Sequence, residues 1–316
     1  MPAIRPMQRQ FRDIMSILSS IFASGFFTSE PVHVAMIVGG GAAIVSGVVG
    51  VFTVIRGHSF AGHALADVSS AGGSASFLFG INPLLGFVIM AVIGAGGIEL
   101  IGVRRAKERS LATGIVLGAG LGLSALFLYF DVTTHSTTGA AITVMFGSMW
   151  AIPASIIPLA VGTGLCALLV AGLLYRPLLL SSVDPDLAEV RGINVRLVGF
   201  LHLMVLALAV ALSAMTVGAI LSTTLLIGPA AIALRLSRRP GWAILVSALI
   251  GLATVWGGIL LAYDSFYWTP GHGWPVSFFI VTLIFILYVA VVHIPDRLNE
   301  ASNVPGYAGS NEAAEG

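Results

Sequence analysis

The residues best suited to chemistry in this sequence are His63 and Asp67, which are four positions apart. In an α-helix this spacing places both side chains on one face. A neutral imidazole and a carboxylate together are typical ligands of divalent transition metals. An ionised Asp inside a membrane helix costs about 2.5–3.5 kcal/mol on insertion scales, so it usually faces a cavity or a partner. The pair therefore predicts a metal site, with a helix-packing hydrogen bond or a position in an aqueous vestibule as the alternatives.

Asp131 and His135 repeat the same spacing in a polar stretch between two apolar segments. We expect this stretch to be an outer turn, where solvated loop residues are the simpler interpretation and a weak capture point for a cation is the other. His202 lies within an apolar segment, and we expect it to be packed or hydrogen-bonded rather than a ligand. Glu99 is interpreted as a local charge partner of the two arginines that follow it in the chain.

A second informative stretch, residues 218–233, contains the adjacent pair Gly228 and Pro229. Proline removes a helix hydrogen bond, so this pair is expected to break or kink the helix. Ser222 and Thr223 supply hydroxyl groups that can satisfy the freed carbonyls. Broken helices often line transport paths in membranes, and a simple proline kink is the alternative interpretation.

Residues 182–193 form a polar and acidic segment that differs from the other loops. Ser182 or Asp184 can cap the N-terminus of a short helix, and Gly192 comes just after its end. The segment is interpreted either as an ordinary interfacial loop helix or as a docking helix for a cytoplasmic partner. The residues assigned to docking are Asp184, Asp186, Leu187, Glu189 and Gly192.

The composition places all of these segments in a membrane protein. Of the 316 residues, 57% are hydrophobic and only 9% are charged, whereas about a quarter of a soluble domain is charged. Long apolar runs without strand alternation predict an all-α integral membrane protein. A net charge of +1 argues against nucleic acid as a partner, and a single Cys excludes a disulfide framework. The only Lys, Lys107, follows Ala106, so the chain lacks a Walker A motif and is not expected to be an enzyme.

The uncharged stretches predict a polytopic bundle of about nine transmembrane helices, with eight to ten as the range. A crossing needs about 20 apolar residues, so the uncharged run 197–234 must turn, near 216–218. We expect three parts: an N-terminal segment 1–32 with an interfacial helix at 14–27, a transmembrane domain 33–295, and a disordered cytoplasmic tail 296–316. A tenth crossing by residues 14–27 is the alternative to an interfacial helix.

Basic residues follow every second predicted span and indicate the orientation. Arginines occur after the first, third, fifth, seventh and ninth spans, whereas the turns 81–83, 131–139 and 264–274 contain neither Lys nor Arg. Because cytoplasmic loops carry the positive excess, we expect the basic loops and the C-terminus to be cytoplasmic. This pattern predicts a multi-pass membrane protein.

Three segments together resemble the permease subunits of the zinc, manganese and iron ABC importer family, over about residues 30–295. Residues 51–67 are similar to its first-span exit and Gly-Asp-x-x-x-His helix, residues 182–193 to its ATPase-coupling loop, and residues 217–233 to its Val-Gly-x-x-Leu…Pro-Ala-Ala segment. The family commonly has Asp before His. Here the order of His63 and Asp67 is reversed and the Pro that usually follows is missing, which leaves the site geometry and the metal preference open.

The resemblance implies the permease of an ATP-driven importer of Zn²⁺, Mn²⁺ or Fe²⁺, in which His63 and Asp67 hold the ion transiently. It implies no permanently bound cofactor, and it implies a bacterial cytoplasmic (inner) membrane as the location. The implied partners are two cytoplasmic ATP-binding subunits, an extracytoplasmic metal-binding protein, and a second permease chain in a homodimer or a heterodimer. The alternatives are a proton-coupled secondary metal transporter and an ABC permease for a metal chelate of the siderophore or cobalamin type.

Overall fold

The computed structural model describes residues 26–101, 106–134, 139–147, 149–268 and 273–293. Within these ranges the chain is predominantly helical and has no strand, which confirms the predicted all-α class. The long helices are α2 (Glu30–Ile55), α3 (Ser59–Phe79), α4 (Pro83–Ile101), α5 (Ala106–Thr134), α7 (Ile157–Leu173), α10 (Val195–Val217), α11 (Ala219–Leu236), α12 (Pro240–Trp268) and α13 (Val276–His293). The short elements are η1 (Phe26–Thr28), α6 (Ala140–Phe146), η2 (Met149–Ala151), η3 (Ala154–Ile156), α8 (Tyr175–Val183) and α9 (Pro185–Val190).

The nine long helices of the described ranges agree with the predicted number of crossings. Eight of the helical segments are long and apolar enough to cross a membrane. The ninth, α3, has 21 residues but includes His63, Asp67 and five serines. Most residues of α3 are buried, so neighbouring helices rather than lipid surround most of it. Polar residues within membrane helices usually face the interior of the bundle in this way.

Two glycines allow α3 to lie very close to α4. A Cβ atom added at Gly72 would be 1.9 Å from the carbonyl oxygen of Gly86, so no side chain fits between the two helices. Small residues at such contacts are typical of helix packing in membranes. The serine hydroxyls of α3 are partly satisfied within the helix: Ser69 donates to the carbonyl of Ala66 and Ser76 to that of Gly72, both at 2.8 Å.

The turns between helices confirm some predicted boundaries and move others. The predicted turn near 216–218 is confirmed, because α10 ends at Val217 and α11 begins after Gly218, whose φ is +96°. Helix α5, by contrast, continues to Thr134, beyond the expected start of the outer turn. Most of the predicted interfacial helix at 14–27 and all of the predicted tail at 296–316 lie outside the described residues.

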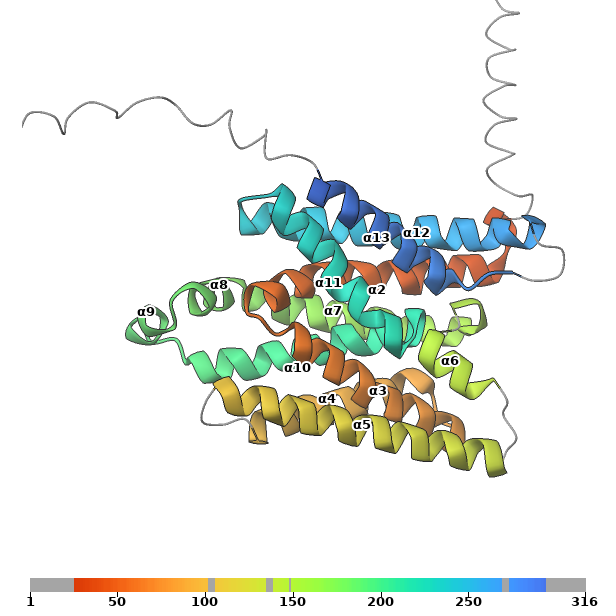
Figure 1. The fold of residues 1–316 in the computed structure, drawn as a ribbon, viewed down its shortest axis with the longest axis horizontal. Coiled ribbons are helices and arrows are strands. Elements are labelled where there is room, and N and C mark those ends of the chain that lie inside the picture. Colours follow the sequence, from red (N-terminus) through yellow and green to blue (C-terminus); the bar gives the residue numbers. More distant parts are fainter. Residues whose placement is uncertain (1–25, 102–105, 135–138, 148, 269–272, 294–316) are drawn as a thin grey trace, which may run out of the picture.

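The connections between the long helices gather at two opposite ends of the bundle (Figure 1). The end at the left of the view holds α8, α9, the start of α10 and the connection from α11 to α12. Six arginines belong to these connections and helix ends: Arg176, Arg191, Arg196, Arg235, Arg238 and Arg239. The α3–α4 and α10–α11 turns at the other end contain no basic residue. Basic residues are therefore concentrated at one end, as the sequence predicts.

Candidate functional site

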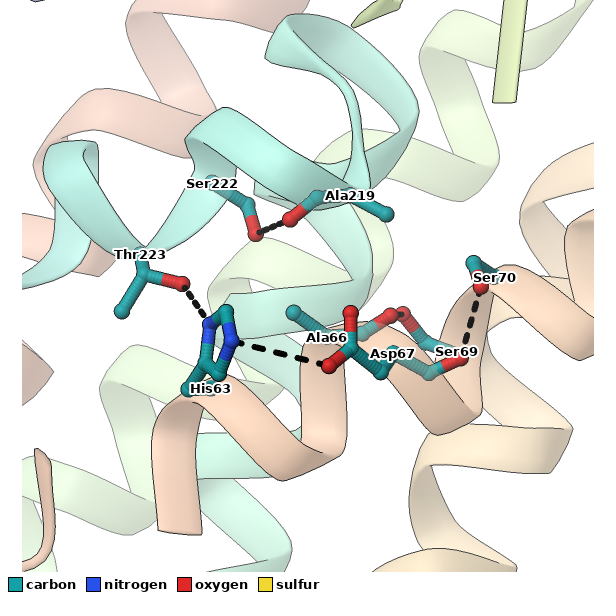
Figure 2. A network of polar contacts seen from close by, with 8 residues as sticks. All are labelled: His63, Ala66, Asp67, Ser69, Ser70, Ala219, Ser222 and Thr223. Carbon is teal, nitrogen blue, oxygen red and sulfur yellow. Dashed lines mark hydrogen bonds and ion pairs between the residues drawn. The ribbon is translucent and has the colours of Figure 1, made fainter. Parts of the chain in front are cut away.

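His63 and Asp67 lie one turn apart near the start of α3 and face each other (Figure 2). His63 Nε2 is 3.6 Å from Asp67 Oδ2. The two side chains differ in exposure, because 45% of the His63 side chain is accessible but only 9% of the Asp67 side chain. The predicted placement on one helix face is therefore confirmed, and the imidazole is the more accessible of the two side chains.

Helix α11 contributes a third polar group to the pair. Thr223 Oγ1 is 3.1 Å from His63 Nδ1 (Figure 2). When Nδ1 carries the proton and donates it to the Thr223 hydroxyl, Nε2 keeps its lone pair on the side of Asp67. A hydrogen bond to the other ring nitrogen is the usual way in which proteins orient a metal-binding histidine. The structure thus joins the two segments 51–67 and 217–233, which the sequence singled out separately.

The His63–Asp67 pair could provide part of the coordination shell of a metal ion. Nitrogen and oxygen ligands of one tetrahedral ion, each about 2.0–2.1 Å from it, lie about 3.3 Å apart. The separation of 3.6 Å between Nε2 and Oδ2 is close to this value. Within the described ranges, no group of three or more His, Cys, Asp or Glu side chains is placed to hold an ion. Because a divalent ion takes roughly four to six ligands, an ion bound by this pair would need further ligands to complete its coordination.

The remaining predicted path residues of α11 have contacts of a different kind. Ser222 is buried, and its hydroxyl donates to the carbonyl of Ala219 at 2.8 Å (Figure 2). A break or a kink was expected at Gly228 and Pro229. The break is wrong, since α11 continues to Leu236 with Pro229 inside it, whereas the kink stays a prediction. Gly228 allows close packing with α13, because a Cβ atom there would be 2.3 Å from Ile284 Cγ2. The interruption of this stretch lies earlier, between α10 and α11.

Asp131 is not the solvated loop residue that we expected. It lies inside α5, near the C-terminal end of that helix, and is fully buried. The expectation was wrong because the polar stretch that begins at Asp131 continues the helix for one more turn. His135 lies outside the described residues. An accessory cation site formed by these two residues stays a prediction.

Two other ionisable residues have partners from distant parts of the chain. Glu99 Oε1 is 3.5 Å from Arg196 Nε at the start of α10, whereas the arginines expected to pair with Glu99 lie outside the described residues. His202 is buried as predicted, and its ring centroid is 5.7 Å from that of His58. The spacing along the chain contains no signal for either contact, because the partners are roughly a hundred or more positions apart.

The segment predicted to dock a partner contains the short capped helix α9. Asp184 Oδ1 accepts a hydrogen bond from the backbone N–H of Leu187 at 2.9 Å, so Asp184 rather than Ser182 is the N-cap. Gly192 follows the helix with φ +79°, a conformation that favours glycine. The predicted start and end signals of this helix are therefore confirmed.

The outer surface of α9 is both acidic and apolar. Asp186 and Glu189 are exposed, and Leu187 and Val190 are 41% and 85% exposed. Only Ala188 of this helix is fully buried. Exposed apolar side chains beside carboxylates fit a surface that another protein covers.

The match to known families covers nearly the whole described chain. The ABC 3 transport family matches residues 29–292. This chain belongs to that family. The manganese import system permease protein ScaB of Streptococcus parasanguinis is 33% identical over 221 residues, which cover 70% of this chain and 78% of ScaB. The high-affinity zinc uptake system membrane protein ZnuB of Haemophilus influenzae is 31% identical over 244 residues, which cover 73% of this chain and 88% of ZnuB.

Solved structures agree with this assignment. The fold is similar to a chain of PsaBC from Streptococcus pneumoniae, determined in complex with Fab, with a TM-score of 0.74, 25% identity, and coverage of 88% of this chain and 96% of that one. An inward-facing metal-chelate type ABC transporter shares the fold with a TM-score of 0.64 at 20% identity, covering 82% and 83%. The family predicted from three short segments, that of ABC-type metal permeases, is confirmed.

Proposed function

We propose that the chain is the permease subunit of an ATP-driven importer of divalent transition-metal ions, with Mn²⁺ or Zn²⁺ as its substrate. The observation that carries this proposal is the His63–Asp67 pair, oriented by Thr223 on a polar helix inside the bundle. The names of ScaB and ZnuB support manganese and zinc as the two candidate metals. Fe²⁺, the third ion expected from the sequence, is tested beside them.

In this proposal the metal ion is cargo and the chain holds no permanent cofactor. Nε2 of His63 and the carboxylate of Asp67 replace part of the hydration shell of the ion. Thr223 keeps the imidazole in the orientation and tautomer that binding requires. Asp67, which is largely buried, offsets part of the charge of the ion within the bundle. Few ligands per chain keep the binding weak enough for release, as conduction requires.

A second permease chain completes the site in this proposal. Almost half of the His63 side chain is open, although a polar group in contact with lipid would be unfavourable. Two copies that face each other would offer two imidazoles and two carboxylates, enough for a four-coordinate ion. We favour a homodimer, and a heterodimer with a related permease is the alternative. The mass of the detergent-solubilised complex distinguishes the two when one chain carries a tag.

We place two cytoplasmic ATP-binding subunits at the arginine-rich end of the bundle. The positive-inside rule supports a cytoplasmic position for this end, and for the C-terminus, in the bacterial inner membrane. The exposed residues of α9 and its flanks form the proposed docking surface: Asp184, Asp186, Leu187, Glu189 and Gly192. The sequence has no Walker A motif, so ATP hydrolysis is assigned to those subunits. An extracytoplasmic metal-binding protein would deliver the ion at the opposite end.

The two alternatives make different demands on the chain. A secondary transporter would run on a proton gradient, and membership of an ABC transport family favours ATP as the energy source instead. A permease for a metal chelate needs a wider path without ligands for a bare ion. The metal-ligating pair in α3 favours the bare ion.

Metal uptake into liposomes that contain this chain and its ATP-binding subunit tests the proposal. Mn²⁺, Zn²⁺ and Fe²⁺ are compared in wild type, in Asp67→Ala, and in Asp264→Ala as a control that removes a carboxylate from α12. We expect uptake of one ion that requires both ATP and Asp67 and that survives in Asp264→Ala. Uptake that follows a proton gradient without ATP, or no uptake of any free ion by a complex with active ATPase, would overturn the proposal.

A further inference from the structure

The turn between α2 and α3 is held by a specific pair of backbone hydrogen bonds. The N–H of Gly57 donates to the carbonyl of Val54 at 3.1 Å, and the N–H of His58 donates to that of Thr53 at 2.8 Å. This is the Schellman arrangement, in which a glycine with positive φ, here +67°, ends the helix. Helix α3 begins directly after this turn and carries His63 in its second turn. The end of α2 and the start of α3 are thus joined by a well-defined corner.

Arg56, the residue just before this corner, connects it to two other helices. Its Nη1 donates to Ser181 Oγ at 2.9 Å and to Ser182 Oγ at 3.3 Å, both in the last turn of α8. Its Nη2 lies beside α10, 3.7 Å from where a Cβ atom at Gly199 would be. The guanidinium group presents five donors in a fixed planar geometry, so it can bridge several elements at once.

A small apolar cluster lies next to these polar contacts. It consists of buried Phe52 from α2, Leu178 from α8 and Val198 from α10. Ile193, which follows α9, packs against this cluster. The segments just before and just after α9 therefore both pack against the end of α2. A displacement of α9 has a direct physical route to the corner at which α3 begins.

We propose that Arg56 is a positioning residue that transmits displacement of α9 to α3, and so links ATPase docking to the metal-binding pair. The inference rests on the proposed function, because it assumes that ATP-binding subunits dock at α9 and that the ion binds at His63 and Asp67. Arg56 acts through two serine hydroxyls on one side and the backbone of the α2–α3 corner on the other. It belongs to neither of the two sites that it connects.

The number of metal ions transported per ATP hydrolysed tests this role, because a residue needed only for folding would not change that ratio. Arg56→Ala is expected to keep ATPase association and equilibrium metal binding within about twofold of wild type, but to lower the ratio by about tenfold. The double variant Ser181→Ala/Ser182→Ala is expected to lower the ratio to a similar extent. Adding Arg56→Ala to it has little further effect, because all three changes remove the same bridge. Arg56→Lys, which keeps the charge but not the planar fork, is expected to be intermediate.

A matched control removes a hydrogen bond that is not part of the Arg56 bridge and that joins α2 to α10. Ser46 Oγ of α2 and Ser213 Oγ of α10 are 2.6 Å apart, and Ser213→Ala is expected to leave the ratio unchanged. A wild-type ratio in Arg56→Ala would overturn the inference and leave the proposed function intact. Absence of ATP-dependent uptake in the wild-type complex would overturn the proposed function itself. If Arg56→Ala does not fold, the double serine variant decides, since it removes only two hydroxyl groups.

Discussion

The His63–Asp67 pair, the proposed metal site, and the α8–α9 segment, which contains the proposed docking surface, are stabilised by different kinds of contact. His63 is oriented by Thr223, which is 160 positions away in the chain, and the helix that carries it is mostly buried. Helix α9 is held by contacts within a few residues, such as that from Asp184 to Leu187, and most of its surface is exposed. An ion site inside the bundle depends on long-range tertiary support, whereas a surface for docking can be specified locally.

This contrast predicts that single changes in α3 have larger effects than single changes in α9. The largest effect is expected from Asp67→Ala, because it leaves His63 as the only metal-ligating side chain of the pair. Metal uptake should fall by about a hundredfold or more, since an intramembrane charge that binds the ion is lost. Co-purification with the ATP-binding subunit should be unchanged. Wild-type uptake in both Asp67→Ala and His63→Ala would refute the assignment.

A large effect on stability is expected where α3 meets α4. Gly72→Ala places a Cβ atom 1.9 Å from the carbonyl oxygen of Gly86, so the helices must separate. We expect a loss of about 3 kcal/mol in the free energy of unfolding, measured by thermal or denaturant unfolding in detergent. Gly41→Ala is the control, because a Cβ atom there has nothing within 4 Å. Equal stability of the two variants would show that α3 is not closely supported.

The docking surface is expected to respond to reversal of its charge. Asp186→Lys combined with Glu189→Lys should weaken binding of the ATP-binding subunit by roughly thirtyfold, or about 2 kcal/mol. Binding of a labelled subunit to the detergent-solubilised permease measures this effect, which should shrink at high salt. Glu30→Lys, an exposed acidic residue at the opposite end of the bundle, should not change it. If the double variant binds the ATP-binding subunit with wild-type affinity, the subunit does not dock on α9.

Thr223→Ala removes the group that orients the imidazole and leaves both metal ligands in place. Loss of such an orienting hydrogen bond should weaken metal binding by about tenfold. Thr223→Ser keeps the hydroxyl and should retain the wild-type affinity. Titration of the purified permease with Mn²⁺ or Zn²⁺ measures this difference. If Thr223→Ala and Thr223→Ser bind the metal with the same affinity, the contact between α3 and α11 does not affect metal binding.

The smallest effect is expected from the cap of α9. Asp184→Ala removes a helix cap worth about 1 kcal/mol, which should weaken association with the ATP-binding subunit by about fivefold. Asp184→Asn keeps the cap and removes the charge, so it separates the two contributions. We expect Asn to restore most of the affinity in the same binding assay. If Asp184→Asn loses as much affinity as Asp184→Ala, the effect is due to the charge rather than to the cap.

The features that were predictable depend on residues close in sequence. Pairing of His63 with Asp67 follows from helix periodicity, and the turn at Gly218 follows from the length of an uncharged run. The same local signals were misleading in two places. Asp131 extends a helix instead of leaving it, and Pro229 is accommodated inside α11. Polarity and proline are weak boundary signals when neighbouring helices bury the residue.

Sequence alone was sufficient for the helical membrane class, the number of long helices in the described ranges, the asymmetry of basic residues, the pairing of His63 with Asp67 and the capped helix α9. These depend on hydropathy, charge and hydrogen bonds within one helix, which are local properties. The burial of polar α3, the contact of Thr223 with His63 and the bridge from Arg56 to α8 emerged only from the assembled bundle. Such contacts depend on how closely distant helices can approach, as at Gly72 and Gly86, and periodicity along the chain carries no information about that distance.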